Sequence, residues 1–136
     1  VSADIYSVTS YKELRREALE AERFNMLNPD KDFKTPYVST VIDNDGVIIA
    51  ASDYVKAIPD SVSKWLPNKL ITLGTDGFGR SEARRELRDF FEVDAKHIVL
   101  AVLYALFREK KIKLSVINKA IKDLDINPDK LNPMIS

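Results

Sequence analysis

A short apolar segment that runs directly into a glycine-rich loop and then into a helix constrains this chain more than any other feature. The segment is LITL at residues 70–73, and the loop that follows, GTDGFGRS at residues 74–81, contains three of the four glycines. Strands that lead through a loop into a helix are typical of α/β folds, in which ligands gather at the carboxyl ends of the strands. The sequence therefore predicts an α/β domain and directs attention to this loop.

Hydrophobic patterning predicts several strands around this unit. The chain has 136 residues, of which 45% are hydrophobic, so it can bury one core and we expect one domain. Apolar segments predict strands at residues 5–8, 38–42, 47–51 and 70–73. Residues 43–46, with the sequence DNDG, indicate a hairpin turn between the second and third strands. The nearly continuous apolar run 47–51 indicates a strand at the centre of a sheet.

Capping residues and apolar spacing predict the helices. Ser10, followed three residues later by Glu13, has the spacing of a capping box and predicts a helix to about Met26. Residues 53–65 have apolar side chains at helical spacing but contain Pro59, which predicts an interrupted helix. Three further helices are expected: one capped by Ser81 that buries Leu87, Phe90 and Phe91, one capped by Asp94 that ends near Glu109, and one from Ser115 that buries Val116, Ile117, Ala120, Ile121 and Leu124.

Composition excludes several classes of site. The 21 basic and 21 acidic residues cancel, which argues against broad attraction to nucleic acid or to an anionic membrane. The absence of cysteine excludes disulfides and a cysteine nucleophile, and the single histidine, His97, excludes a multi-histidine zinc centre within one chain. The longest apolar run, residues 98–107, is shorter than the roughly 20 residues that cross a bilayer. We therefore expect no nucleic-acid partner and no membrane partner, and the opening without methionine or signal peptide indicates part of a longer chain.

The glycine-rich loop at residues 74–81 has two interpretations. As an anion site, Gly77 and Gly79 would let the backbone approach a phosphate while Arg80 supplies charge. The spacing, however, matches neither GxGxxG nor GxxxxGK[ST]. We favour the structural interpretation, in which the glycines shape a tight turn, Phe78 fills the core and Arg80 pairs with a carboxylate.

Other candidate chemistry has less support. Asp76 with Glu82, or Asp43 with Asp45, could form acid pairs, but sequence gives no sign of the enclosure that catalytic carboxylates need. His97 as a general base would need an orienting partner that the sequence does not identify. We therefore expect solvated turn residues and a histidine without a catalytic role.

Several stretches, taken in order, resemble one family. They are SVTSYKEL at residues 7–14, ERFNMLNP at 22–29, ASDY at 51–54, LGTDGFGRS at 73–81, FEVD at 91–94 and DKLNP at 129–133. From about residue 6 to its end, the chain resembles the C-terminal domain of the homodimeric bacterial pyruvate dehydrogenases, the decarboxylating first components of pyruvate dehydrogenase complexes.

This resemblance implies a fold and a place in a longer protein. The expected fold is a three-layer α/β fold like the transketolase C-terminal domain, with a small mixed, mostly parallel sheet of about five strands flanked by helices. Residues 1–136 are then one C-terminal domain of a longer chain. Residues 1–9 join it to the preceding domain, and residues 127–136 form a C-terminal extension.

The resemblance also implies a structural role within a bacterial cytoplasmic enzyme. That enzyme decarboxylates pyruvate with thiamine diphosphate and magnesium and transfers acetyl to the lipoyl group of the dihydrolipoamide acetyltransferase component. The cofactor lies between the first two domains, so no catalytic, cofactor-binding or metal-binding residue is expected in this chain. The implied partners are the preceding domains, the second subunit of the homodimer and the acetyltransferase.

Polar residues and glycines within the matching motifs are candidate structural or interface residues, and the polar ones would act through charge-assisted bonds. These candidates are Arg23, Asp53, Asp76, Gly77, Gly79 and Arg80. The alternative function is a free-standing protein-interaction or small anion-binding α/β module that uses the loop from Gly74 to Ser81.

Overall fold

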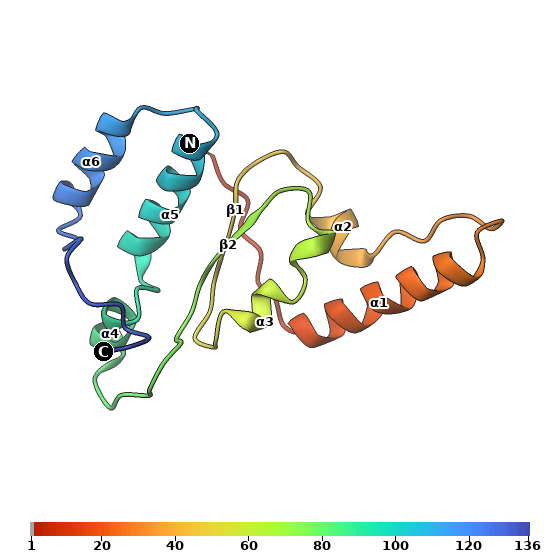
Figure 1. The fold of residues 1–136 in the computed structure, drawn as a ribbon, viewed down its shortest axis with the longest axis horizontal. Coiled ribbons are helices and arrows are strands. Elements are labelled where there is room, and N and C mark those ends of the chain that lie inside the picture. Colours follow the sequence, from red (N-terminus) through yellow and green to blue (C-terminus); the bar gives the residue numbers. More distant parts are fainter. Residues whose placement is uncertain (1) are drawn as a thin grey trace.

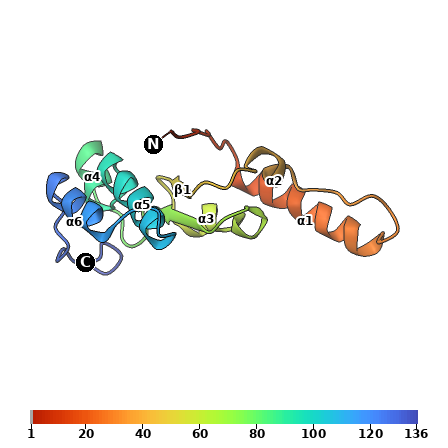
Figure 2. The same cartoon turned by 90° about the horizontal axis from the view of Figure 1, so that it is seen from above.

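Two short parallel strands cross the middle of an elongated molecule and separate two groups of helices (Figure 1). The computed structural model describes residues 2–136. On one side lie α1 (Tyr11–Leu27), α2 (Tyr37–Val41), α3 (Ala57–Asp60) and the 3-10 helix η1 (Ser63–Trp65); on the other lie α4 (Arg84–Phe90), α5 (Ala95–Arg108) and α6 (Leu114–Asp123). Seen from above, α1 forms one end of the molecule, and α4 and α6 lie at the other (Figure 2).

The two strands form where the sequence predicts strands at 47–51 and 70–73. β1 (Ile48–Ala51) and β2 (Leu70–Leu73) are parallel, with Ile48 opposite Leu70 and Ala51 opposite Leu73. The crossover between them contains α3 and η1, and Pro59 is buried within α3. The predicted interruption of the helical stretch 53–65 is therefore confirmed.

The predicted sheet of about five strands is wrong for the residues that the structure describes, in which two strands pair. Residues 5–8 form no strand, and Ile5 is 94% exposed. With one hydrogen-bonded neighbour, β1 is an edge strand rather than the predicted central strand. Parallel strands are usually covered on both faces, whereas the side chains of β1 and β2 are at best half-buried.

Residues 38–41 belong to α2 and Ile42 follows its end, so the predicted strand at 38–42 is wrong and there is no hairpin at 43–46. The carbonyl of Pro36 accepts hydrogen bonds from the amides of Ser39 (3.0 Å) and Thr40 (3.3 Å), which closes a helical turn. Val38 is buried, and the Ser39 hydroxyl donates to the carbonyl of Trp65 at 2.6 Å. Packing against η1 thus overrides the strand propensity of the β-branched residues.

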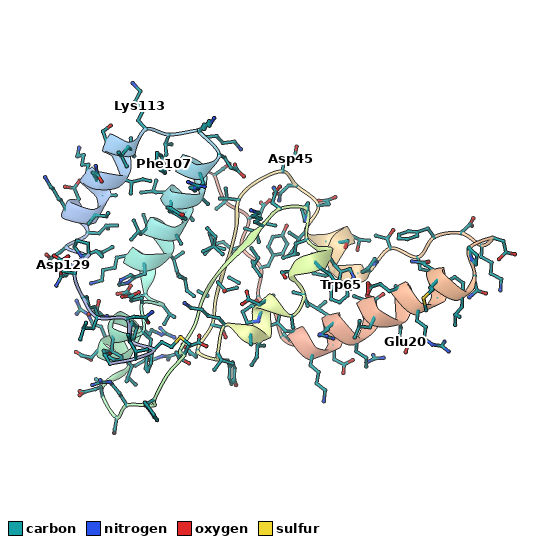
Figure 3. All side chains as sticks on the ribbon, in the orientation of Figure 1. Glu20, Asp45, Trp65, Phe107, Lys113 and Asp129 are labelled. Carbon is teal, nitrogen blue, oxygen red and sulfur yellow. The ribbon has the colours of Figure 1, made fainter. Side chains whose placement is uncertain are left out.

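The N-terminal helix follows its sequence signals. The Ser10 hydroxyl accepts a hydrogen bond from the Glu13 amide at 3.2 Å, which confirms the predicted cap. The helix buries Ala18 and Ala21, whose small side chains allow close approach of the neighbouring elements. On its exposed side, Glu20 projects away from the helix (Figure 3).

The helices that follow β2 agree in part with the prediction. Asp94 caps α5 by accepting from the His97 amide at 3.2 Å, as expected. Ser81 does not cap α4, because the extended residue Ala83 precedes the first helical turn and places Ser81 too far from its free amides. α6 begins one residue before Ser115, and of the residues predicted to be buried there Ile117 is buried, Val116 is 43% exposed, and Ala120, Ile121 and Leu124 are half-buried.

Burial is sparse throughout the described residues. The buried apolar residues are Ala18, Ala21, Val38, Pro59, Val62, Phe91, Val93, Ala101 and Ile117. Among residues 2–136, no helix combines the length and the apolar character needed to cross a membrane.

Candidate functional site

The carboxyl ends of β1 and β2 meet at one edge, where two loops are bonded to each other. The Thr75 amide donates to the Tyr54 carbonyl at 3.0 Å, and the Thr75 hydroxyl donates to the Asp53 carbonyl at 2.7 Å. The Asp76 carboxylate accepts from the Lys56 amide at 3.1 Å. These bonds make the start of the glycine-rich loop a structural connection between the two strand ends.

Two of the loop glycines occupy positions that exclude a side chain. A Cβ on Gly74 would lie 2.6 Å from the Tyr54 carbonyl oxygen. Gly77 has a φ of +102°, and a Cβ there would lie 2.9 Å from the Pro133 carbonyl oxygen and 2.9 Å from the Met134 Cα. Gly79, in contrast, has open space around it.

Phe78 and Arg80 differ from the prediction. Phe78 does not fill the core, because it is 84% exposed. Arg80 pairs with no carboxylate among the described residues; its guanidinium lies 4.0 Å from the centre of the Phe90 ring and donates to the Ser136 carbonyl at 3.3 Å. The last residues of the chain therefore lie against the glycine-rich loop, and Ser136 is one of the two partners of Arg80.

Two adjoining cavities lie between this edge and the helices α4 and α5. The larger, of about 710 Å³, is lined by Ala51, Ser52, Asp53, Arg84, Arg85, Arg88, Val93, Asp94, Ala95 and Ile98. The smaller, of about 290 Å³, is lined by Asp53, Thr75, Gly79, Arg80, Arg84, Leu87, Arg88, Phe91 and Val93. Because both are lined by Asp53, Arg84, Arg88 and Val93, we treat them as one feature and call it the arginine groove.

The arginine groove carries more positive than negative side chains. It is lined by Arg80, Arg84, Arg85 and Arg88, against the carboxylates of Asp53 and Asp94. Asp53 lies 3.7 Å from Arg88 (Oδ2 to Nη2), and Asp94 bonds to the backbone and ring of His97. Both carboxylates therefore have partners, and the groove presents guanidinium groups to a visiting anion.

One three-residue group among the described residues brings together potential metal ligands. Ligand atoms of Asp89, Asp94 and His97 lie within 4.8 Å of one another. Asp94 Oδ1, however, lies 2.5 Å from His97 Nδ1, and Asp89 Oδ1 lies 2.5 Å from Lys96 Nζ. One oxygen of each carboxylate is thus bonded to a nitrogen of the protein, Lys96 Nζ for Asp89 and His97 Nδ1 for Asp94.

The ion pair between Asp89 and Lys96 shifts the pKa of each group. The hydrogen bond from Lys96 lowers the pKa of Asp89, against the opposing effect of desolvation, and the charges of Lys96, Lys130 and His97 lower it further. The hydrogen bond to Asp89 raises the pKa of Lys96. Both groups are thus held in their charged forms.

The other predicted residues lie apart from this edge. Arg23 is exposed on α1, and Asp43 and Asp45 are exposed in the loop before β1. Sequence reasoning identified Arg80 and Asp53 but missed Arg84, Arg85 and Arg88. The sequence pattern that could have identified two of them is the four-residue spacing of Arg84 and Arg88, which places both on one face of the helix after the loop.

Comparison with known proteins adds independent information. Residues 1–94 match the family model described as the transketolase-like TK C-terminal domain. The chain is 43% identical to the pyruvate dehydrogenase E1 component of Buchnera aphidicola subsp. Schizaphis graminum over 137 residues, which cover 100% of this chain and 15% of that protein.

Two further relatives are also pyruvate dehydrogenase E1 components. Identity is 43% over 136 residues with the Pseudomonas aeruginosa protein, covering 98% of this chain and 15% of the relative. It is 42% over 137 residues with the Escherichia coli K12 protein, covering 100% of this chain and 15% of the relative. The chain thus spans about 15% of the length of these curated relatives.

Proposed function

The chain belongs to the transketolase-like TK C-terminal domain family, and on that premise we propose that it is the C-terminal structural and interface domain of a pyruvate dehydrogenase. In this proposal residues 1–9 join it to a preceding domain and residues 127–136 are the C-terminal extension. The identity of 42–43% to three pyruvate dehydrogenase E1 components supports the assignment.

The observation that carries the proposal is the large surface area. The described structure exposes 9977 Å², whereas a compact monomer of 15.4 kDa exposes about 7200 Å² by the scaling of surface area with mass. The excess of about 2800 Å² exceeds the roughly 800 Å² that each partner buries in a standard interface. A chain of this shape is suited to being covered by other domains.

The end of α1 and the loop 28–36, which we call the arm, supply part of this exposed surface. Met26 and Phe33 are each 73% exposed, and Leu27 is more than half exposed. The arm is nevertheless ordered, because the Asn25 side chain accepts from the Lys34 amide at 2.8 Å and donates to the Lys34 carbonyl at 2.9 Å. An ordered, projecting apolar surface is typical of an interface.

The same proposal assigns the chemistry to the rest of the longer chain. The parent enzyme uses thiamine diphosphate and magnesium, decarboxylates pyruvate, and transfers acetyl to the lipoyl group of the dihydrolipoamide acetyltransferase component. Among the described residues the one group of potential metal ligands, Asp89, Asp94 and His97, does not fit magnesium, which binds oxygen ligands, because it includes an imidazole nitrogen and one oxygen of each carboxylate is bonded to Lys96 or His97. The chain's role is to pack against the preceding domains and the second subunit of a homodimeric cytoplasmic enzyme.

The proposal is tested first by the intact mass of the native polypeptide that carries these residues, measured by mass spectrometry. We expect a chain several-fold longer, with acetyl-transferring pyruvate dehydrogenase activity. A native product of this length would contradict the assignment. As a second test, calorimetry on the separate 136-residue chain should detect no magnesium-dependent binding of thiamine diphosphate, and tight binding would contradict the structural role.

A free-standing interaction or anion-binding module is the second candidate, and the arginine groove is the observation that favours it. The intact mass separates the two, because a free-standing module has a native product of this size. The glycine-rich loop itself gives little support to an anion cradle, since the Thr75 amide is bonded to Tyr54 and Gly77 lies against the chain end.

A further inference from the structure

We propose that the arginine groove binds a small organic molecule that carries more than one anionic oxygen group. This function goes beyond the proposed packing role, and it uses side chains of α4 rather than the backbone of the glycine-rich loop. The groove lies at the carboxyl ends of two parallel strands, the place where ligands bind in open α/β sheets.

Two guanidinium groups of the groove are available to bind an anion. Arg84 and Arg85 make no ion pair with any carboxylate of residues 2–136, and both line the larger cavity. Arg84 also lines the smaller cavity, together with Arg88. Guanidinium groups bind carboxylates and phosphates through paired hydrogen bonds, so this wall is suited to oxyanions.

The two acidic residues that line the groove, Asp53 and Asp94, already have partners. Asp94 caps α5 and contacts His97, and Asp53 lies 3.7 Å from Arg88. An anion that approaches Arg84 and Arg85 therefore meets no unpaired carboxylate among the lining residues described. The groove therefore has a local excess of positive charge, although the whole chain has equal numbers of acidic and basic residues.

The size and the mixed lining of the larger cavity suit a small organic molecule. The larger cavity, of about 710 Å³, is within the range of small-molecule sites. Its lining also includes Ala51, Val93 and Ile98, which offer apolar contacts beside the charged wall. A ligand with an apolar body and two or more phosphate or carboxylate groups matches this combination.

The test is titration calorimetry on the native polypeptide that carries these residues, with metal removed by chelation. Inorganic pyrophosphate and citrate serve as separate probes, so that phosphate and carboxylate ligands are distinguished. We expect saturable binding of at least one probe that weakens as salt concentration rises. The double variant R84A/R85A should weaken it at least about tenfold, because two charge-assisted contacts are lost.

A matched control removes two arginines that lie away from the groove. Arg15 on α1 and Arg108 on α5 are exposed and make no ion pair with described residues, so R15A/R108A should change the affinity less than about twofold. The milder variant R84K/R85K keeps the charges but loses the guanidinium geometry, and it should bind more weakly than the unmodified protein.

Three results would overturn the proposal. One is that the metal-free native polypeptide binds neither probe saturably. Another is that R84A/R85A and R15A/R108A weaken binding equally, which would indicate general charge attraction. The third is that R84K/R85K, confirmed as folded by circular dichroism, binds both probes unchanged. Each of these outcomes leaves the packing role of the chain unaffected, because that role is tested by the intact mass.

Discussion

Gly77 and Met134 lie so close together that a Cβ on Gly77 would come within 2.9 Å of the Met134 Cα. This contact joins the glycine-rich loop after β2 to the last residues of the chain, 57 positions later in the sequence. The Arg80 guanidinium donates to the Ser136 carbonyl at 3.3 Å in the same region, and Lys130 Nζ donates to the Phe90 carbonyl at 2.7 Å. The last residues of the described chain are therefore bonded to the loop after β2 and to α4.

Replacing Gly77 with alanine should destabilise the chain by about 1–3 kcal/mol, because the positive φ and the close contact with Met134 both oppose a side chain. The matched control is Gly79→Ala in the same loop, where the structure leaves open space. That control should change the free energy of unfolding by less than about 0.5 kcal/mol. Urea unfolding measures the free energy of unfolding of both variants. Equal losses of stability would show that the contact between Gly77 and Met134 is unimportant.

Replacing Asp76 with alanine should cost about 1 kcal/mol of stability, because the Lys56 amide then loses its hydrogen-bond acceptor. Asp43→Ala removes an exposed carboxylate that accepts no hydrogen bond from described residues, so it serves as the control. Thermal unfolding compares the two. A loss for Asp43→Ala as large as that for Asp76→Ala would contradict a specific role of the loop contact.

Replacing Asp94 with alanine should cost about 0.5–2 kcal/mol through loss of the cap of α5. Asn at this position retains an oxygen that accepts from the His97 amide, so Asp94→Asn should recover most of the loss. Lys113→Ala, at the equivalent position of α6, removes a side chain that makes no cap bond. Chemical denaturation of all three variants measures their free energies of unfolding. If Asp94→Asn loses as much stability as Asp94→Ala, the charge of Asp94 is responsible instead of its cap.

Lys96→Gln should reduce stability only within a defined pH window. The folded pKa of Asp89 lies below 3.8, so its contribution is present above that value and disappears as pH falls through the folded pKa. The folded pKa of Lys96 lies above 10.5, so its contribution is present below that value and disappears as pH rises through the folded pKa. Between these limits we expect a difference of at most about 1 kcal/mol, because the pair is partly exposed.

The measurement for Lys96→Gln is urea unfolding at pH ~6 and again in acid below the folded pKa of Asp89. The variant and the unmodified chain should converge in acid. Lys119→Gln on α6, an exposed lysine with no ion pair among the described residues, should show no such pH dependence. A difference for Lys96→Gln that persists unchanged in acid would rule out the ion pair as its source.

Adding charge to the arm should weaken self-association of the separated 136-residue chain. Met26 and Phe33 expose most of their surface, so M26E/F33E should raise the dissociation constant of any oligomer by about tenfold or more. Sedimentation equilibrium measures this, and Leu131→Glu at the exposed C-terminal extension is the control. An unchanged dissociation constant in M26E/F33E would place the interface elsewhere.

Local signals predicted the elements whose stability depends on nearby residues. Ser10 and Asp94 identified the starts of α1 and α5, since a cap acts within four residues of the chain. The apolar runs identified β1 and β2. Residues 38–42 were predicted wrongly, because burial of Val38 and the bond from Ser39 to Trp65 depend on η1, more than twenty residues away.

The sequence by itself determined the caps of α1 and α5, the positions of β1 and β2 and the family, because short-range hydrogen bonding, apolar runs and ordered motifs depend on residues that are close along the chain. Only the tertiary structure decided where Phe78 and Arg80 point, how the C-terminal extension meets Gly77, and that Arg84, Arg85 and Arg88 share one groove with Asp53. These relationships join residues that are distant in sequence, and their energies depend on distances and burial that arise only when the chain is folded.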